Sequence, residues 1–211
     1  LRKTFKELLI KKNLTISLQS GVMLGTMVRE ARKHNICGLE SLVGVPGTVG
    51  GALIMNAGAF GGEISNYFLE AKTMTLDGDI KTYTKEDVQF SYRYSSFPLD
   101  EILIEATFKC KKGNPEKILE EQKKSSQRRK STQPLKYRSA GSIFKNPSKK
   151  LAAGYLIEKA GLKGINYGGA SISEKHANFI VNRGNATAEE VFHLIVLVRQ
   201  KVAEKFNINL E

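Results

Sequence analysis

The stretch GVPGTVGGALIMNAGAFGG, residues 44–62, decides how this chain is interpreted, because it holds seven of the nineteen glycines. Glycine loses more conformational freedom on folding than any other residue, so a cluster this dense needs a structural reason. Either the stretch makes tight turns, or a ligand rests on its bare main chain. We favour the ligand, since Gly44, Gly47, Gly50 and Gly51 are spaced to present backbone N–H groups to an anion.

The glycine stretch matches neither of two common phosphate-binding motifs. The dinucleotide pattern G-x-G-x-x-G and the P-loop pattern G-x-x-x-x-G-K-[ST] are both absent from the sequence. The spacing therefore supports neither a Rossmann half nor a P-loop.

The composition is that of a soluble globular protein. Hydrophobic residues make up 41% and charged residues 26% of the sequence. A chain of 211 residues is long enough for one large domain or two small ones. No apolar run is long enough to span a bilayer, and residues 1–13 form a charged amphipathic stretch rather than a signal peptide. We expect a cytoplasmic protein without a membrane partner.

The two cysteines suggest neither a disulfide framework nor a metal site. Cys37 and Cys110 lie far apart in sequence, without a C-x-x-C or Cys/His spacing. We expect both thiols to be buried apolar fillers and no metal to be bound.

The formal charge of +12 attracts polyanions. Residues 123–138, KKSSQRRKSTQPLKYR, carry seven cations and no acid. The simpler interpretation is a solvated helix face, and the sharper one is that a few of these cations line a site for a phosphorylated substrate. A basic module that binds RNA or another polyanion is the alternative function. It ranks lower because no nucleic-acid motif is present and the seven tyrosines, apart from Tyr137, are not interleaved with the run.

Local patterns predict an α+β fold. The clearest signals are a hairpin around Asp77-Gly78 and a last helix whose capping box pairs Thr187 with Glu190. In that helix Val191, Leu194, Val198 and Val202 line one face. Further helices are expected over residues 22–36, 116–129 and 151–164, and strands over 102–110 and 177–182.

Three short segments carry polar residues of the types found in catalytic and ligand-binding sites. FSYRYSSF, residues 90–97, places Arg93 among aromatic side chains, where it is either a stacked surface residue or a fixed cation for a carboxylate. SAGSIFKNP, residues 139–147, has no serine-hydrolase elbow, so Ser142 is by default a turn residue. In EKHANFIVN, residues 174–182, a capping or core role is the default for His176 and Asn178.

Taken together and in order, these segments resemble one family. The stretch 38–64, then FSYRYSSF, SAGSIFKNP, AGYLIEKAGLKG, HANFIVN and the ending KFNINLE are similar to UDP-N-acetylenolpyruvoylglucosamine reductases. The resemblance covers essentially the whole chain and fits the compact branch that lacks a tyrosine-bearing insertion. It implies the second part of an FAD-binding domain of the vanillyl-alcohol-oxidase or carboxymethylase type, residues 1–110, followed by an α+β substrate-binding domain, residues 111–211.

The resemblance also implies an activity and its residues. Members of the family use NADPH and FAD to reduce the enolpyruvyl group of a UDP-sugar in peptidoglycan precursor synthesis. Arg93 and Ser142 match the family's carboxylate-binding arginine and proton donor, and Lys130, Lys145, Asn146 and His176 match substrate-pocket positions. The residues expected to contact FAD are Gly44, Val45, Pro46, Gly47, Thr48, Gly50, Gly51, Ala52, Asn56, Gly58 and Ala59.

The sequence departs from the family pattern at both ends. The G-x-G-S-N turn of the family's N-terminal segment is absent, and the family's catalytic glutamate falls two residues beyond Glu211. We therefore expect these 211 residues alone to bind FAD weakly or not at all, and not to turn over.

Overall fold

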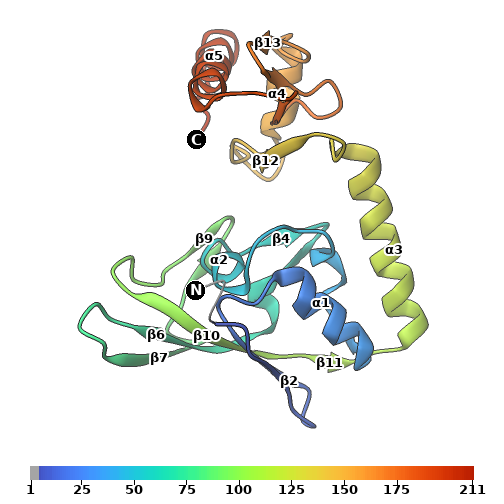
Figure 1. Cartoon of the computed structure of the whole chain (residues 1–211), viewed down its shortest axis with the longest axis vertical. Helices are drawn as coiled ribbons and strands as arrows, with labels where there is room; N and C mark the ends of the chain where they lie inside the picture. The colour runs from blue at the N-terminus through green and yellow to red at the C-terminus, as the bar shows by residue number, and fades with distance from the viewer. Residues whose placement is uncertain (1–4) are drawn as a thin grey trace. The chain divides into compact units, whose positions relative to one another are not determined.

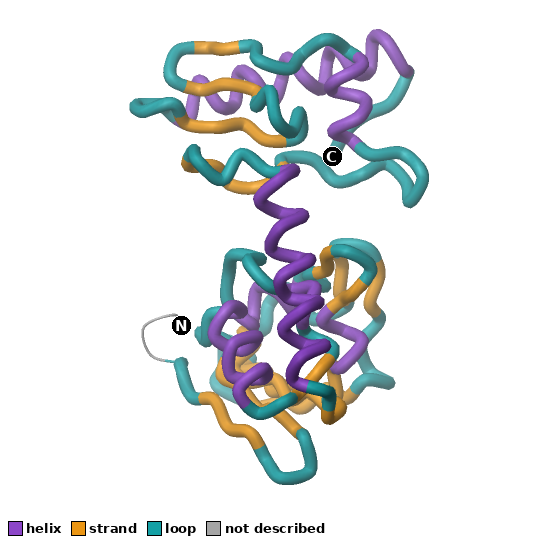
Figure 2. The backbone as a smooth tube through the Cα atoms, turned by 90° about the vertical axis from the view of Figure 1, so that its right-hand side faces the viewer, coloured by secondary structure: helices purple, strands orange, loops and turns teal. Residues whose placement is uncertain are grey.

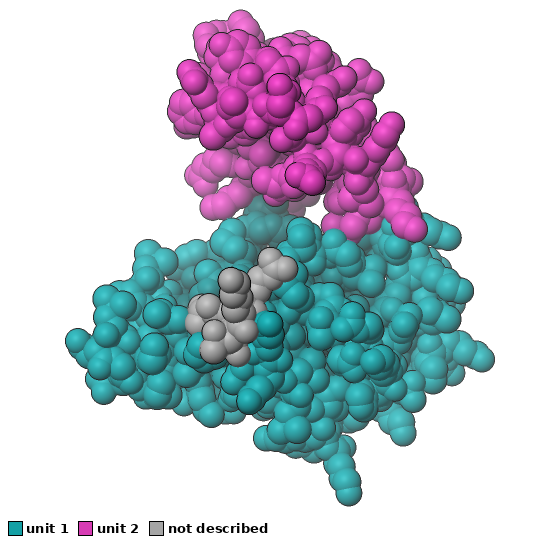
Figure 3. All heavy atoms as spheres, in the orientation of Figure 1, with its two compact units in different colours: residues 1–128 teal, residues 129–211 magenta. Residues whose placement is uncertain are grey.

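The computed structural model describes residues 5–211, which form two compact units. Residues 1–128 make up unit 1 and residues 129–211 make up unit 2, coloured separately in Figure 3. Helix α3, Pro115–Thr132, contributes residues to both units. Each unit has its own hydrophobic core, so each is described by itself.

Unit 1 is built on a five-stranded antiparallel sheet with the order β1-β2-β10-β6-β7 (Figure 1). Strands β2 and β10 join segments about 90 residues apart, and Ser17 Oγ lies 3.2 Å from Thr107 Oγ1 across them. The bounds are β1 Leu8–Ile10, β2 Thr15–Gln19, β6 Phe68–Met74, β7 Ile80–Thr84 and β10 Ile102–Lys109.

The predicted hairpin and the strand after it are confirmed. β6 and β7 pair through the turn at Asp77-Gly78, where Gly78 has φ +94°. The carboxylate of Glu101, whose side chain is only 4% exposed, links residues of β6 and β7 at this end of the sheet. It accepts hydrogen bonds from Thr73 Oγ1 at 2.6 Å, Lys81 Nζ at 2.7 Å and Tyr83 Oη at 3.0 Å. Lys81 and then Thr73 lower the pKa of Glu101.

The N-terminal region contains a strand that the local patterns did not predict. Residues 1–13 have a helix-like pattern, but Leu8–Ile10 form β1, which pairs with β2; residues 1–4 lie outside the described part of the chain. The antiparallel ladder with β2, which pairs Ile10 with Ile16, outweighs local helix propensity here. The connection between the two strands, residues 11–14, holds no glycine, so the local pattern carried no hairpin signal.

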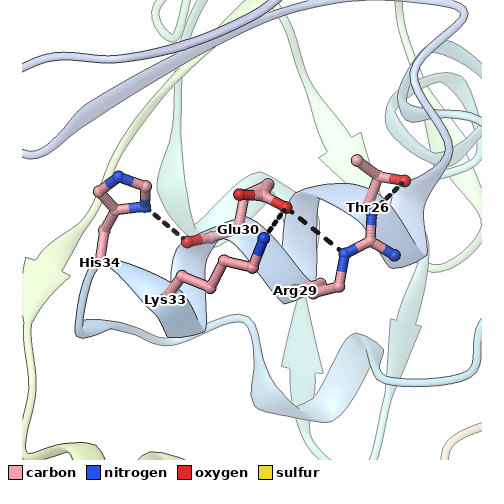
Figure 4. A network of polar contacts seen from close by, with 5 residues as sticks. All are labelled: Thr26, Arg29, Glu30, Lys33 and His34. Carbon is pink, nitrogen blue, oxygen red and sulfur yellow. Dashed lines mark hydrogen bonds and ion pairs between the residues drawn. The ribbon is translucent and has the colours of Figure 1, made fainter.

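Helix α1, Leu24–Lys33, confirms the prediction for residues 22–36. Leu24, Met27, Val28 and Ala31 are buried on one face, while Met23 is the exposed N-cap. The opposite face carries the polar network of Figure 4: Glu30 accepts from Lys33 at 3.0 Å and Arg29 at 3.4 Å. Lys33 holds the pKa of Glu30 below its usual value. Such exposed pairs add little stability.

The remaining elements of unit 1 are short and surround an aromatic cluster. Phe68 packs edge-on against Phe90, Phe97 and Phe108, with centroids 5.3–6.4 Å apart. Figure 2 shows how much of the chain runs in loops between these short elements. The bounds are β3 Ile36–Cys37, η1 Glu40–Leu42, α2 Val49–Ile54, β4 Gly58–Ala59, β5 Gly62–Glu63, η2 Ile64–Tyr67, β8 Phe90–Ser91, β9 Tyr94–Ser95 and β11 Lys111–Lys112.

Unit 2 has a four-stranded antiparallel sheet with the order β12-β15-β14-β13; helix α5 packs on β13 and β14, and α4 packs against α5. The predicted capping box of α5 is present, with both Thr187 and Glu190 engaged. Leu194, Val198 and Val202 are buried, as their spacing predicts. The bounds are β12 Arg138–Ser142, α4 Ala153–Lys159, β13 Asn166–Tyr167, β14 Ala170–Ile172, β15 Phe179–Asn182 and α5 Ala188–Phe206.

Both cysteines are free thiols. Cys110 is buried, as predicted, and burial raises its pKa to about 12. Cys37 is only half-buried and donates to the carbonyl of Lys111 at 3.4 Å, so it is less of a core filler than expected. Within residues 5–211, none of the helices combines the length and the apolar character that crossing a bilayer requires.

Candidate functional site

The first half of the glycine stretch is an exposed loop that leads into α2. Gly44, Pro46, Gly47 and Gly51 are exposed, and Gly44 and Gly47 have φ of +72° and +119°. Thr48 caps α2, its Oγ1 accepting from Gly51 N at 3.4 Å. The loop therefore presents main chain at the surface of unit 1, with few side chains above it.

Several amides at the start of α2 are already used within the protein. The N–H groups of Val49 and Gly50 donate to the carbonyls of Val22 and Ser20 at 2.8 Å and 2.9 Å. Because these amides and that of Gly51 have protein acceptors, an anion nest here would depend on the N–H groups that precede α2.

The glycines of the stretch separate into two groups by what a Cβ would meet. At Gly50 a Cβ would lie 2.8 Å from Ser20 Cβ, and at Gly58 it would lie 2.8 Å from Gly62 O. At Gly62 it would overlap Ser41 Oγ. Protein packing therefore requires these three glycines.

The second group leaves space. Among the described residues, a Cβ at Gly47 or Gly61 would meet nothing within 4 Å, and at Gly51 only Thr48 Oγ1 at 3.8 Å. Gly51 has no positive φ, so backbone conformation does not require glycine there. Gly47 and Gly51 thus border open space, as a surface that receives a ligand should.

Ala52 and Asn56, also predicted to contact the cofactor, point into the protein. Ala52 is 7% exposed and Asn56 is fully buried. The Asn56 amide is hydrogen-bonded to Glu63, Ser91 and Ser65. Cofactor contact by Asn56 would therefore involve its main chain.

Arg93 sits at the turn between β8 and β9 with φ +56°, a conformation that is uncommon for a residue with a side chain. Its Nη2 donates to Gly58 O at 3.0 Å, and its guanidinium lies 5.1 Å from the centre of the Tyr92 ring. The hydrogen bond links Arg93 to the second half of the glycine stretch, so unit 1 brings together two motifs whose bonded residues are 35 positions apart.

Ser142 ends β12, in unit 2, and is exposed. The register of β12 against β15 shifts by one residue between Ser139 and Ser142, and Gly141 within this bulge has φ +87°. β-bulges redirect side chains and are common near functional sites. The SAG sequence thus sets where the Ser142 hydroxyl lies at the end of the strand.

The other predicted residues of unit 2 gather at the start of α4. Asn146 Oδ1 accepts from Ala153 N at 3.1 Å, and a Cβ on the neighbouring Gly154 would lie 3.3 Å from His176 Cε1. Burial, with the charge of Lys163 as a smaller cause, lowers the pKa of His176 and favours the neutral ring. Asn146 and His176 therefore both lie next to the N-terminus of α4.

The two predicted lysines are exposed. Lys145 lies 3.6 Å from Glu211 Oε2 through its ammonium group, and its N–H donates to Glu211 O. The backbone carbonyl of Lys130 accepts from Lys175 Nζ at 2.6 Å.

Part of the basic run makes contacts within the protein. Lys124 forms ion pairs with Glu120 and Glu121, and the Arg128 guanidinium lies 4.9 Å from the centre of the Phe60 ring. These contacts agree with the simpler interpretation of the run as a solvated helix face.

Asn178 is the main residue of this region that was not assigned to the site. It is 4% exposed, and its amide makes hydrogen bonds to both the N–H and the carbonyl of Phe144. The sequence indicated a capping or core role as the default, with ligand contact as the less favoured alternative, and these hydrogen bonds fit the core role. The pairing with Phe144 carries no local signal, because the two residues are 34 positions apart.

Models of known protein families match both halves of the chain. Residues 1–84 match the model of an FAD binding domain, and residues 133–211 match that of the UDP-N-acetylenolpyruvoylglucosamine reductase C-terminal domain. The crystal structure of UDP-N-acetylenolpyruvylglucosamine reductase from Thermus caldophilus aligns with 92% of this chain and 70% of its own, at 38% identity and a TM-score of 0.82. The chain belongs to the UDP-N-acetylenolpyruvoylglucosamine reductase family.

Curated members of this reductase family are similar over nearly the whole chain. The reductase 2 of Bacillus cereus is 46% identical over 198 residues, and the reductase of Enterococcus faecalis is 43% identical over 198 residues. Each alignment covers 93% of this chain but only 65% and 66% of the relative. The chain therefore spans just under two thirds of these reductases. The family and its α+β architecture, an FAD-binding region followed by a reductase C-terminal domain, agree with the resemblance found in the sequence.

Proposed function

We propose that this chain is the larger part of an FAD-dependent enzyme that uses NADPH to reduce UDP-N-acetylglucosamine enolpyruvate to UDP-N-acetylmuramate, a cytoplasmic step in peptidoglycan precursor synthesis. The observation that carries the proposal is the match over 92% of the chain to a solved reductase with a TM-score of 0.82. In this proposal residues 1–110 form part of the FAD-binding domain and residues 111–211 the substrate-binding domain.

The residues present fit a flavin. Gly47 and Gly51 border open space where side chains would otherwise stand, and the loop around them is exposed main chain. We assign Gly44, Val45, Pro46, Gly47, Thr48 and Gly51 to the cofactor surface. FAD, when bound, takes a hydride from NADPH and delivers it to the enolpyruvyl double bond.

Arg93 then stabilises the charge that develops on the substrate. Addition of hydride to the terminal carbon of the double bond pushes the electron pair toward the adjacent carbon and its carboxylate, giving an enolate. A guanidinium offers five N–H donors in a rigid planar fork, and one of them is bound to Gly58 O. The remaining donors are suited to a carboxylate.

Ser142 completes the reaction by giving the proton of its hydroxyl to the carbon next to the carboxylate. The serine regains a proton from solvent, so the balance is one hydride from NADPH and one proton added across the double bond. A serine hydroxyl is a weak acid, but an enolate is a strong enough base to take its proton when a nearby cation stabilises the alkoxide. Lys130 and Lys145 are the candidate cations, and we assign Asn146 and His176 to contact with the sugar nucleotide.

The test is a substrate-dependent assay on the full-length protein. Purified enzyme should show flavin absorption and should oxidise NADPH only when the enolpyruvyl sugar nucleotide is present. A colourless protein, or NADPH oxidation that ignores the sugar nucleotide, would overturn the proposal.

A further inference from the structure

Both polar atoms of the Asn56 side chain, near the candidate site, are engaged in hydrogen bonds within the protein. It is fully buried, has a left-handed backbone conformation with φ +41°, and follows the end of α2. Its Nδ2 donates to Glu63 Oε2 and to Ser91 O, both at 3.0 Å, and its Oδ1 accepts from Ser65 N at 3.4 Å. An amide nitrogen carries two hydrogens, so both are used.

The Asn56 side chain helps to attach the β8–β9 hairpin, which carries Arg93, to the end of α2. Ser91 lies in β8, two residues before Arg93, and its carbonyl is held by Asn56. On the other strand, Ser95 is 8% exposed and its Oγ donates to Ile54 O at 2.7 Å. Both strands of the hairpin are therefore tied to the C-terminal end of α2, and Arg93 occupies the turn between them.

The guanidinium of Arg93 is tied to the same group of residues. Its acceptor, Gly58 O, lies in β4, where Gly58 pairs directly with Glu63 of β5. This pairing is tight, because a Cβ at Gly58 would lie 2.8 Å from both Gly62 O and Glu63 Cγ. Glu63 thus accepts from Asn56 and also supports the strand whose carbonyl holds Arg93.

We infer that Asn56 and Glu63 form a positioning pair that fixes the guanidinium of Arg93 for the substrate carboxylate. The pair acts on both ends of the arginine: Asn56 sets the hairpin backbone, and Glu63 supports Gly58. The inference rests on the proposed function, in which Arg93 touches the substrate. Displacement of a catalytic group by about 1 Å can cost on the order of 100-fold in rate, so we expect losses of about 10–100-fold in kcat when the pair is broken.

Two variants break the pair in different ways. Asn56→Gly removes all three side-chain bonds but tolerates the left-handed backbone, which separates the bonds from backbone strain. Glu63→Ala removes the acceptor from a half-buried position and serves if Asn56→Gly does not fold. Glu63→Gln keeps an acceptor oxygen for Asn56, so it should retain activity within a few-fold. Asn35→Gly is the matched control, because Asn35 is another left-handed asparagine of unit 1, with φ +56°.

The deciding experiment is a double-mutant cycle with Arg93→Lys in the full-length holoenzyme, following kcat for reduction of the enolpyruvyl sugar nucleotide. Asn56→Gly should lower kcat about 10–100-fold in the wild-type background and less than about 3-fold in the Arg93→Lys background. Equal losses in the two backgrounds, as a general structural defect would give, overturn the inference.

A second readout separates this inference from the proposed function. The ¹⁵N resonances of the Arg93 guanidinium, recorded without substrate, should shift in Asn56→Gly and Glu63→Ala but not in Asn35→Gly. Unchanged resonances in both pair variants overturn the positioning pair. If the resonances shift as expected but Arg93→Lys reduces the sugar nucleotide at the wild-type rate, the proposed role of Arg93 fails, and with it the catalytic meaning of the pair.

Discussion

The side-chain amide of Asn178 holds the peptide groups on both sides of Phe144. Asn178 Oδ1 accepts from Phe144 N at 3.0 Å, and Nδ2 donates to Phe144 O at 2.9 Å. The backbone adds a third bond, from Ile143 N to Asn178 O at 3.0 Å. This contact fixes the segment that immediately follows Ser142.

Asn178→Ala should therefore destabilise the protein strongly. It leaves the N–H and carbonyl of Phe144 without their side-chain partners in a buried setting, and each such loss costs about 1–3 kcal/mol. We expect a loss of about 2–4 kcal/mol in the free energy of unfolding, measured by urea denaturation. Asn166→Ala, at an exposed position of β13, is the control and should change it by less than about 0.5 kcal/mol. Equal losses in the two variants would show that the hydrogen bonds between Asn178 and Phe144 add nothing to the free energy of unfolding.

Ser142→Ala should separate the two half-reactions. Loss of a general acid slows the step it serves by about 10²–10⁴-fold, so reoxidation of the reduced flavin by the sugar nucleotide should slow by that factor. Reduction of the flavin by NADPH should keep its wild-type rate in stopped-flow measurements. Ser148→Ala, at an exposed serine of unit 2 outside β12, should leave both rates unchanged. A similar loss in both half-reactions of Ser142→Ala would argue against its role as proton donor.

His176 should make stability depend on pH. Burial lowers the pKa of His176 in the folded protein below its usual value of 6.5. As the pH falls below about 6.5, the unfolded state takes up a proton that the folded state still refuses, so the free energy of unfolding decreases until the lowered pKa is passed. His176→Gln should reduce this slope, as measured by denaturation at several pH values between 5 and 7, about the range in which an unperturbed histidine titrates. Identical pH profiles for the two proteins would contradict the assignment.

Local chemistry was enough to predict the elements whose partners are near in sequence. The Asp77-Gly78 turn and the Thr187–Glu190 capping box are examples, since a hairpin turn and a helix cap are each set by a few adjacent residues. Strand β1 was missed although its partner β2 is near in sequence, because the connection between them, residues 11–14, holds no glycine and gives no hairpin signal. The pairing of β2 with β10, about 90 residues later, leaves no periodic signal of its own.

The site shows the same limit at the level of single residues. Sequence could mark Gly50 and Gly51 as part of a special loop but could not separate them, because the difference lies in Ser20, which packs against Gly50 alone. Likewise, Asn56 stands among residues that suggest ligand contact, yet its amide bonds to Glu63 and Ser91. Both distinctions depend on which distant side chain folds against the stretch.

The central claim is that the main chain at Gly47 and Gly51 carries no side chains because the flavin binds against it. The most direct test is the FAD content and dissociation constant of full-length Gly51→Val, whose side chain would enter the open space while the backbone conformation is kept. Gly25→Val is the control, because Gly25 also lies in a helix and a Cβ there would meet nothing within 4 Å among the described residues. We predict that Gly51→Val folds but loses its flavin while Gly25→Val retains it. A folded Gly51→Val that binds FAD as tightly as the wild type would contradict the account.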